Sequence, residues 1–182
     1  MGAMTVLVLQ DKADLESIMA RVEWTTLVFF ATLFVVIEAL NRLGLLGFIG
    51  SLVSSVISGV RPGAQLPLAI LVIVWVSGIT SGFIDNIPFA TMMVPIINDL
   101  SSELGLPLQP LVYSLALGCC LGGNLTLIGA SANLVCAGVA EQHGYPITFM
   151  KFFLVGAPLT IVSLIVSTVY LMICHVAFEW HL

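Results

Sequence analysis

Asp85 is an acidic residue in a strongly apolar part of this 182-residue chain. It lies in a polar, glycine-containing stretch, residues 77–91, between the apolar runs 66–76 and 92–97. An ionised carboxylate at bilayer depth costs at least ~2.5–3.5 kcal/mol, so such a residue normally faces a water-filled cavity or a partner group. Pro88 has no N–H and disfavours helical geometry at the residue before it, so one helix must end and another begin near it. We therefore expect the tip of a broken or re-entrant helical hairpin that holds a small ion; the alternative is a kinked helix with a neutral or structurally paired Asp85.

A second polar stretch interrupts a long apolar segment farther along the chain. Residues 118–133 contain four glycines, two asparagines, a serine and a threonine, which do not form a continuous lipid-facing helix. We expect helix to end near Leu121, non-helical backbone over residues 122–133, and helix again towards Cys136. Irregular backbone at membrane depth occurs only where it is buried in protein or lines a cavity. This second break is therefore a second candidate binding segment.

Two breaks at membrane depth are typical of the binding site of a secondary transporter. Helix N-termini favour anionic groups, whereas helix C-terminal carbonyls and side-chain oxygens favour Na⁺ or H⁺. The candidate ligands carry oxygen or amide groups: Asp85, Asn86, Thr91, Asn124, Thr126, Ser131 and Asn133. The candidates for breaking the helices and letting the backbone approach an ion are Gly82, Pro88, Gly122, Gly123 and Gly129. Because desolvation disfavours the ionised form of a buried acid and a bound cation favours it, Asp85 is the expected proton or sodium site.

The composition places these elements in a lipid bilayer. The chain is 59% hydrophobic and only 8% charged, with a mean hydropathy of +1.14, which is far from the composition of a soluble domain. We expect an all-α polytopic membrane protein. Its segments are an amphipathic lead-in (1–23), a transmembrane helix (24–40), an interfacial helix (43–60), a re-entrant hairpin (66–100) with its tip at 84–88, a broken transmembrane helix (110–140) and a final transmembrane helix (149–174). The hairpin arms are expected at Leu66–Gly82 and Pro88–Leu100, and the short second arm favours a re-entrant hairpin over two spans.

Several other function classes lack the residues that they need. The net charge of −5 includes no basic cluster that could bind nucleic acid. The four cysteines lie in apolar segments without Cys-x-x-Cys spacing, which argues against a disulfide framework or a zinc site: Cys119, Cys120, Cys136 and Cys174. An intramembrane aspartyl protease needs two facing carboxylates, and a rhomboid-type protease needs Gly-x-Ser-Gly, whereas Gly129-Ala-Ser131 is followed by Ala132. We therefore expect neither an enzyme nor a bound cofactor, with Na⁺, H⁺ or an anion as the coupled ion.

Five runs of the sequence resemble a known transporter family. They are residues 22–30, 84–89, 120–124, 126–133 and 135–145. Together they resemble the citrate-transporter-like ion transporter superfamily, which includes dicarboxylate symporters, arsenite pumps and sodium/proton antiporters, and the Glu-Gln-His-Gly-Tyr run at 141–145 resembles its members in pigment-cell organelles. The resemblance implies two inverted repeats, each with a hairpin and a broken span, in homodimers with an elevator-like transport domain. It places the hairpin-tip motif on Asp85, Asn86 and Pro88, and the broken-span motif on Gly123, Asn124, Thr126, Gly129, Ser131 and Asn133.

Two departures from this family narrow the prediction. The tip reads Asp85-Asn-Ile-Pro88, which is closer to sodium/proton antiporters than to the Ser-Asn-Thr of dicarboxylate symporters. One repeat is recognisable, so we expect half of a binding site and a fragment that lacks the N-terminal repeat. We predict a multipass secondary transporter of a small ion or organic anion in a melanosome or endolysosomal-type organelle membrane, with an effect on organelle pH. The alternatives are an anion channel and an inactive regulatory partner of a full-length transporter.

Overall fold

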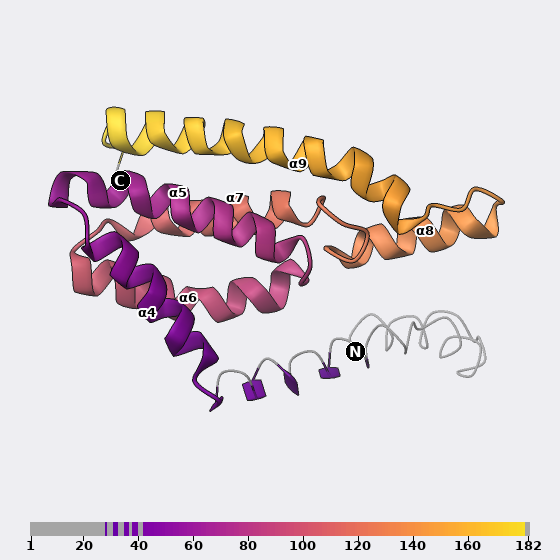
Figure 1. Cartoon of the computed structure of the whole chain (residues 1–182), viewed down its shortest axis with the longest axis horizontal. Helices are drawn as coiled ribbons and strands as arrows, with labels where there is room; N and C mark the ends of the chain where they lie inside the picture. Colours follow the sequence, from indigo (N-terminus) through magenta and orange to yellow (C-terminus); the bar gives the residue numbers. More distant parts are fainter. Residues whose placement is uncertain (1–27, 29–30, 33–34, 37, 40–41, 181–182) are drawn as a thin grey trace, which may run out of the picture. The chain divides into compact units, whose positions relative to one another are not determined.

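The computed structural model describes residues 28, 31–32, 35–36, 38–39 and 42–180 (Figure 1). The chain divides into two compact units, Met1–Ala39 and Leu40–Leu182, and the elements below all belong to the second unit. The predicted lead-in 1–23 lies outside the described residues, as does most of the predicted span 24–40.

All regular elements in the described part of the second unit are helices and none is a strand, which confirms the all-α prediction at this level. Its elements are α4 (Leu45–Ser58), α5 (Pro62–Ser81), α6 (Asn86–Leu104), α7 (Leu108–Gly122), α8 (Ser131–Gln142), α9 (Phe149–Leu171) and a π-helical turn η1 (Met172–Ala177). Two of these helices are long and apolar enough to cross a membrane, namely α5 and the continuous helix Phe149–Ala177. The described residues therefore fit a membrane protein with at least these two candidate spans.

The arms of the hairpin, α5 and α6, are longer than the sequence predicts. α5 begins at Pro62, in the first turn where a missing N–H leaves no bond unmade, and not at Leu66. α6 begins at Asn86 and ends at Leu104, where Gly105 adopts a left-handed conformation with φ of 64°. The 20 and 19 residues of the two arms give each a length of about 30 Å, the thickness of the hydrocarbon core. The short predicted arm, Pro88–Leu100, favoured a re-entrant hairpin over two spans. The observed arm lengths do not favour it.

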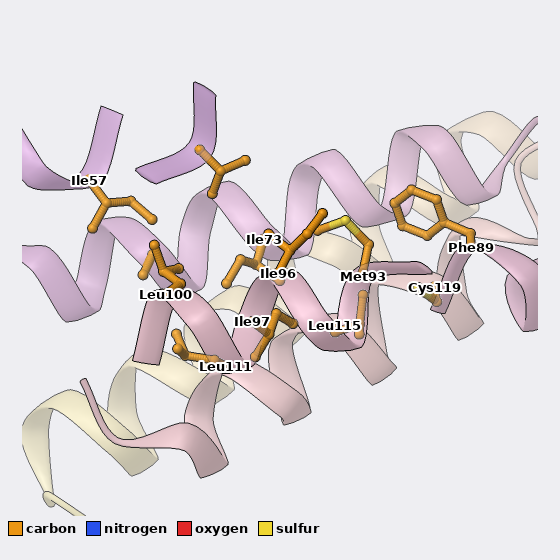
Figure 2. Packing of buried hydrophobic residues seen from close by; sticks show 12 residues of the cluster. Ile57, Ile73, Phe89, Met93, Ile96, Ile97, Leu100, Leu111, Leu115 and Cys119 are labelled. Carbon is orange, nitrogen blue, oxygen red and sulfur yellow. The ribbon is translucent and has the colours of Figure 1, made fainter. Parts of the chain in front are cut away.

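One hydrophobic core holds the hairpin against α4 and α7 (Figure 2). It is built from side chains that recur at helical spacing on each helix: Val53 and Ile57 on α4, Ala69 and Ile73 on α5, Phe89, Met93, Ile96, Ile97 and Leu100 on α6, and Leu111, Leu115 and Cys119 on α7. Ile73, Met93 and Leu111 are at most 1% exposed. α6 contributes five of these twelve side chains, more than any other helix, so burial of its inner face fixes the hairpin on α7.

A smaller core joins α9 to the other face of α5. Ile70 and Val74 of α5 pack with Leu164 and Leu171 of α9. In Figure 1, α9 runs along α5 and α7, while α8 continues beyond the end of α7. The remaining large apolar side chains of α9 are mostly exposed, as lipid-facing side chains are in a membrane helix.

Candidate functional site

Glycines allow α5 and α7 to run side by side and in parallel. A Cβ atom added at Gly118 would lie 2.7 Å from the carbonyl oxygen of Val74, and one at Gly122 would lie 2.2 Å from that of Gly78. The two helix backbones are therefore in contact along their C-terminal halves, as small residues permit in membranes. Gly118 lies beside Val74, and four residues further along both helices Gly122 lies beside Gly78. The helices therefore run in the same direction, and their C-terminal ends lie together. This brings the hairpin tip, residues 82–85, to the break in the second span, residues 123–130.

The Asp85 carboxylate joins the beginnings of two helices at this point. Its Oδ1 accepts a hydrogen bond from the N–H of Ile87 at 3.1 Å, which caps α6. Its Oδ2 accepts one from the N–H of Ser131, the first residue of α8, at 3.3 Å. The residue before Ser131 is Ala130, which has no side-chain acceptor, so Asp85 caps a second helix that cannot cap itself. Asp85 is 7% exposed, so this carboxylate is buried and held by backbone donors.

A second set of contacts joins the C-terminal end of α5 to the break. The Thr126 hydroxyl, which is fully buried, donates a hydrogen bond to the Gly82 carbonyl. A Cβ at Gly129 would lie 2.8 Å from the carbonyl oxygens of both Gly82 and Gly123, so the backbone passes here at a distance that only glycine allows. Three of the predicted residues therefore meet where the hairpin tip contacts the break: Gly82 of the tip, and Thr126 and Gly129 of the break.

The side chain of Asn133 donates hydrogen bonds to two carbonyls of the non-helical segment. Its Nδ2 donates to the carbonyl of Gly123 at 2.9 Å and to that of Thr126 at 3.1 Å. The Gly123 carbonyl has no helical partner because α7 ends at Gly122, so the side-chain amide supplies a donor there. The Thr126 carbonyl also accepts the backbone N–H of Gly129 at 3.2 Å. Non-helical backbone thus spans residues 123–130, and helix returns at Ser131, earlier than the predicted position near Cys136.

Candidate oxygen ligands lie on both of the segments that Asp85 joins. Two N–H donors and the positive ends of two helix dipoles stabilise negative charge on Asp85. The Thr126 hydroxyl and the carbonyls of Gly82 and Gly123 supply neutral oxygens at the neighbouring helix end. One carboxylate with hydroxyl and carbonyl oxygens is the ligand chemistry of a small hard cation or a proton. Among the described residues, no cluster of three or more His, Cys, Asp or Glu side chains offers a site for a transition metal.

Two predicted ligands lie away from the carboxylate. Thr91 is exposed and donates its hydroxyl to Ile87 of its own helix at 2.9 Å. Asn124 is also exposed and lines a cavity on the side of α9. Asn86, the first residue of α6, is partly buried. The ion-binding role of all seven predicted ligands stays a prediction.

Some residues that shape the site were not among the predicted site residues. Gly156 of α9 lies against the break, since a Cβ there would be 2.4 Å from the Asn124 carbonyl oxygen. Ser81 donates its hydroxyl to the Cys119 carbonyl at 2.8 Å and so ties α5 to α7 just before both helices end. The small residues in Gly156-Ala-Pro158 were a usable signal for close approach, but they do not reveal which segment approaches.

Comparison with known proteins identifies the family. The citrate transporter family model matches residues 1–118, which include the whole hairpin and Asp85. The chain belongs to the citrate transporter family. It is 51% identical to the P protein of Sus scrofa and 51% identical to the P protein of Homo sapiens, in each case over 100% of this chain and 22% of the relative. It is 35% identical to an uncharacterized transporter of Synechocystis over 93% of this chain and 41% of that protein.

These relatives confirm the predicted resemblance to this family. They also confirm the resemblance of the run at 141–145 to particular members of it, which are the P proteins. The chain spans about a fifth of the length of the P proteins that it matches, 22% of each. No solved structure matches the chain significantly. The family model covers the hairpin tip, whereas the break at residues 123–130 lies beyond residue 118 and is covered by the matches to the P proteins.

Proposed function

We propose that this citrate transporter family chain forms half of the ion site of a secondary transporter, with Asp85 as the group that binds Na⁺ or H⁺. The observation that carries the proposal is the double contact of the Asp85 carboxylate, with Ile87 N–H at the hairpin tip and Ser131 N–H at the break. A carboxylate that serves only as an N-cap bonds to the N–H groups of a single helix. Here the same two oxygens hold two separate segments together.

The position of the tip along α9 supports a site within the membrane. The 29-residue helix Phe149–Ala177 has its midpoint at Ser163, and Gly156 lies against the break about 10 Å nearer the N-terminal end of α9. With this helix centred on a hydrocarbon core about 30 Å thick, the tip lies inside the core and off its midplane. Because α5 and α7 run parallel, both begin on the opposite face, and the hairpin enters and leaves from that face. The depth of the tip and the parallel course of α5 and α7 therefore support a re-entrant hairpin, although the lengths of its arms do not.

Ion binding at Asp85 is coupled to the contact between tip and break. A proton or a cation on the carboxylate lowers its negative charge and weakens its hydrogen bonds to the two N–H groups. The bond to Ser131 is the longer of the two, at 3.3 Å against 3.1 Å. Binding of the ion therefore loosens the hairpin tip from α8, and loss of the ion restores the contact. Such a coupling lets ion occupancy govern whether the site is closed.

The test is Asp85→Asn in the full-length protein that carries this chain, reconstituted in liposomes with a Na⁺ or pH gradient. The amide oxygen can still accept from one N–H, whereas the negative charge is lost. We expect ion-coupled flux to fall to background while membrane insertion persists, with a fall in melting temperature no larger than the loss of one cap, roughly 1 kcal/mol, explains. Asp99→Asn is the matched control, because Asp99 is exposed near the other end of the same helix. Unchanged coupled flux in Asp85→Asn would refute the proposal.

An anion channel is the second candidate, because the first N–H groups of α6 and α8 converge at one point and helix N-termini attract anions. Under voltage clamp, a channel gives currents that reverse at the anion equilibrium potential without coupled cation flux. A regulatory partner without transport of its own is the third. It is identified by crosslinking to a full-length copy and by absence of flux in liposomes that contain this chain alone.

The finer assignments rest on the relatives. P proteins of mammals match the whole chain over 22% of their own length, which supports a second, N-terminal repeat in the complete transporter. We propose that the transported species is a small ion or organic anion, that the transporter is a homodimer, and that it acts on the pH of a melanosome or related organelle.

A further inference from the structure

A cavity of about 360 Å³ lies between the first turns of α9 and the segments that precede it. One wall is a single face of α9, from Lys151 to Leu159, and the other is formed by residues 146–147 and by Asn124 in the break. Asp85 is not among the residues that line it. The cavity is therefore separate from the contact between the hairpin tip and α8.

The cavity has one charged group, at one end. Lys151 is the only lysine or arginine after Arg61 in the sequence, and its side chain is exposed. It lies in the first turn of α9, which contains no acidic residue, so the helix dipole adds to its positive charge there. An anionic ligand at this end would be attracted by both.

Apart from Asn124, the rest of the lining is apolar, and its α9 face is exposed. Phe152, Val155 and Leu159 follow Lys151 on the same face of α9, and Val155 and Leu159 are 70% and 58% exposed. Lys151 and Leu159 are eight residues apart, about 12 Å along the helix. Since Phe149–Ala177 is a candidate span, Lys151 lies near the membrane surface and Leu159 lies in the hydrocarbon.

This arrangement matches the two parts of a lipid. We propose that the cavity binds one anionic phospholipid, with its phosphate at Lys151 and the first part of an acyl chain along Phe152, Val155 and Leu159. A small hydrated anion satisfies Lys151 but leaves the apolar wall in contact with water, which is unfavourable. A basic residue at the membrane surface above an apolar groove is the chemistry that selects anionic headgroups.

Because Asn124 belongs to the break, a lipid in the cavity would contact the break through this residue. Asn124 lines the cavity, and its backbone carbonyl is the group against which Gly156 packs. A lipid in the cavity therefore touches the same non-helical segment that Asp85 caps at Ser131. Lipid binding is measurable by itself, so its test does not depend on transport.

The test is native mass spectrometry of the purified chain with palmitoyl-oleoyl phosphatidylglycerol or with phosphatidylcholine of the same chains. We expect one phosphatidylglycerol to be retained in preference to phosphatidylcholine. Lys151→Gln lowers that retention about fivefold, the change that corresponds to about 1 kcal/mol per base at a membrane surface, and Lys151→Arg keeps it. Val155→Trp, which fills the groove, abolishes it.

Two matched controls separate this site from general attraction of lipid. Leu154→Trp places the same side chain on the neighbouring position, which is 67% exposed and does not line the cavity. Arg61→Gln removes an exposed base at the start of α5. Both controls retain the lipid. Equal loss in Arg61→Gln or Leu154→Trp, absence of a preference for phosphatidylglycerol, or displacement of the lipid by glycerol phosphate alone would each overturn the proposal.

Discussion

Asp85 replaces a cap that the local sequence of α8 does not provide. Asp is a good N-cap for its own helix, and the sequence predicts a helix start at this place from Asp85 and Pro88. Its second bond, to Ser131, joins residues that are 46 positions apart and could not be predicted from local patterns. The sequence identified the carboxylate as important, but only the packing of α5 on α7 shows that it holds two helix ends. A cap is worth roughly 1 kcal/mol, so two caps on one buried side chain make the tip sensitive to its charge.

Thr126→Val tests the neighbouring contact at the scale of one hydroxyl. Valine keeps the shape of the side chain but leaves the Gly82 carbonyl without the donor that pairs it. A buried acceptor without a partner costs about 1–3 kcal/mol, so we expect a lower melting temperature in detergent by several degrees. Thr126→Ser keeps the hydroxyl and should lose less. Thr91→Val is the matched control, because the Thr91 hydroxyl is exposed and bonds within its own helix; an equal loss in that control would contradict the assigned role of Thr126.

Helix ends in the sequence are marked by local chemistry, whereas helix lengths are not. Pro62, Pro88 and Gly105 each indicate an end, and the structure has helix ends at or beside all three. The second arm of the hairpin was predicted to end at Leu100 because the polar residues Ser101, Ser102 and Glu103 follow it, although these residues continue α6 to Leu104. Polarity at the end of a membrane helix indicates that the chain has reached the surface, and it does not by itself end a helix.

Gly122→Ala tests the close approach of α5 and α7. The added methyl group would lie 2.2 Å from the Gly78 carbonyl oxygen, which is backbone and cannot turn aside, so the two helices must separate. We expect a fall in melting temperature corresponding to about 1–3 kcal/mol, together with loss of the tip contacts at Asp85.

Gly138→Ala provides the matched control for that substitution. Gly138 lies in α8 with nothing within 4 Å of an added Cβ. Because alanine favours helix by up to about 1 kcal/mol over glycine, this variant should melt at the same or a higher temperature. If Gly122→Ala and Gly138→Ala behaved alike, the α5–α7 contact would not limit stability.

The whole second unit presents a polar tip on one side of a bundle whose outer faces are largely apolar. Within the described residues, α9 buries a narrow stripe that includes Gly156, Thr160 and Leu164, and most of its other large apolar side chains are exposed. Lipid or further protein must cover these faces. Family membership and composition were readable from the sequence alone. The depth of the tip was not, because it depends on where α9 passes the break.

Labelling of single cysteines tests the arrangement of the whole unit in the membrane. In a background without native cysteines, Ala64→Cys in the first turn of α5 and Ser102→Cys in the last turn of α6 should react with an impermeant maleimide from one face. Tyr145→Cys, in the loop before α9, should react from the other face; all three positions are exposed. A re-entrant hairpin keeps its tip inside the membrane, so Phe83→Cys should stay unlabelled from the face of residue 145 although Phe83 is 53% exposed. Labelling of Phe83→Cys as fast as Tyr145→Cys would show two full spans with the tip in water. That result would move Asp85 out of the hydrocarbon, and the argument that a buried charge there needs an ion would no longer apply.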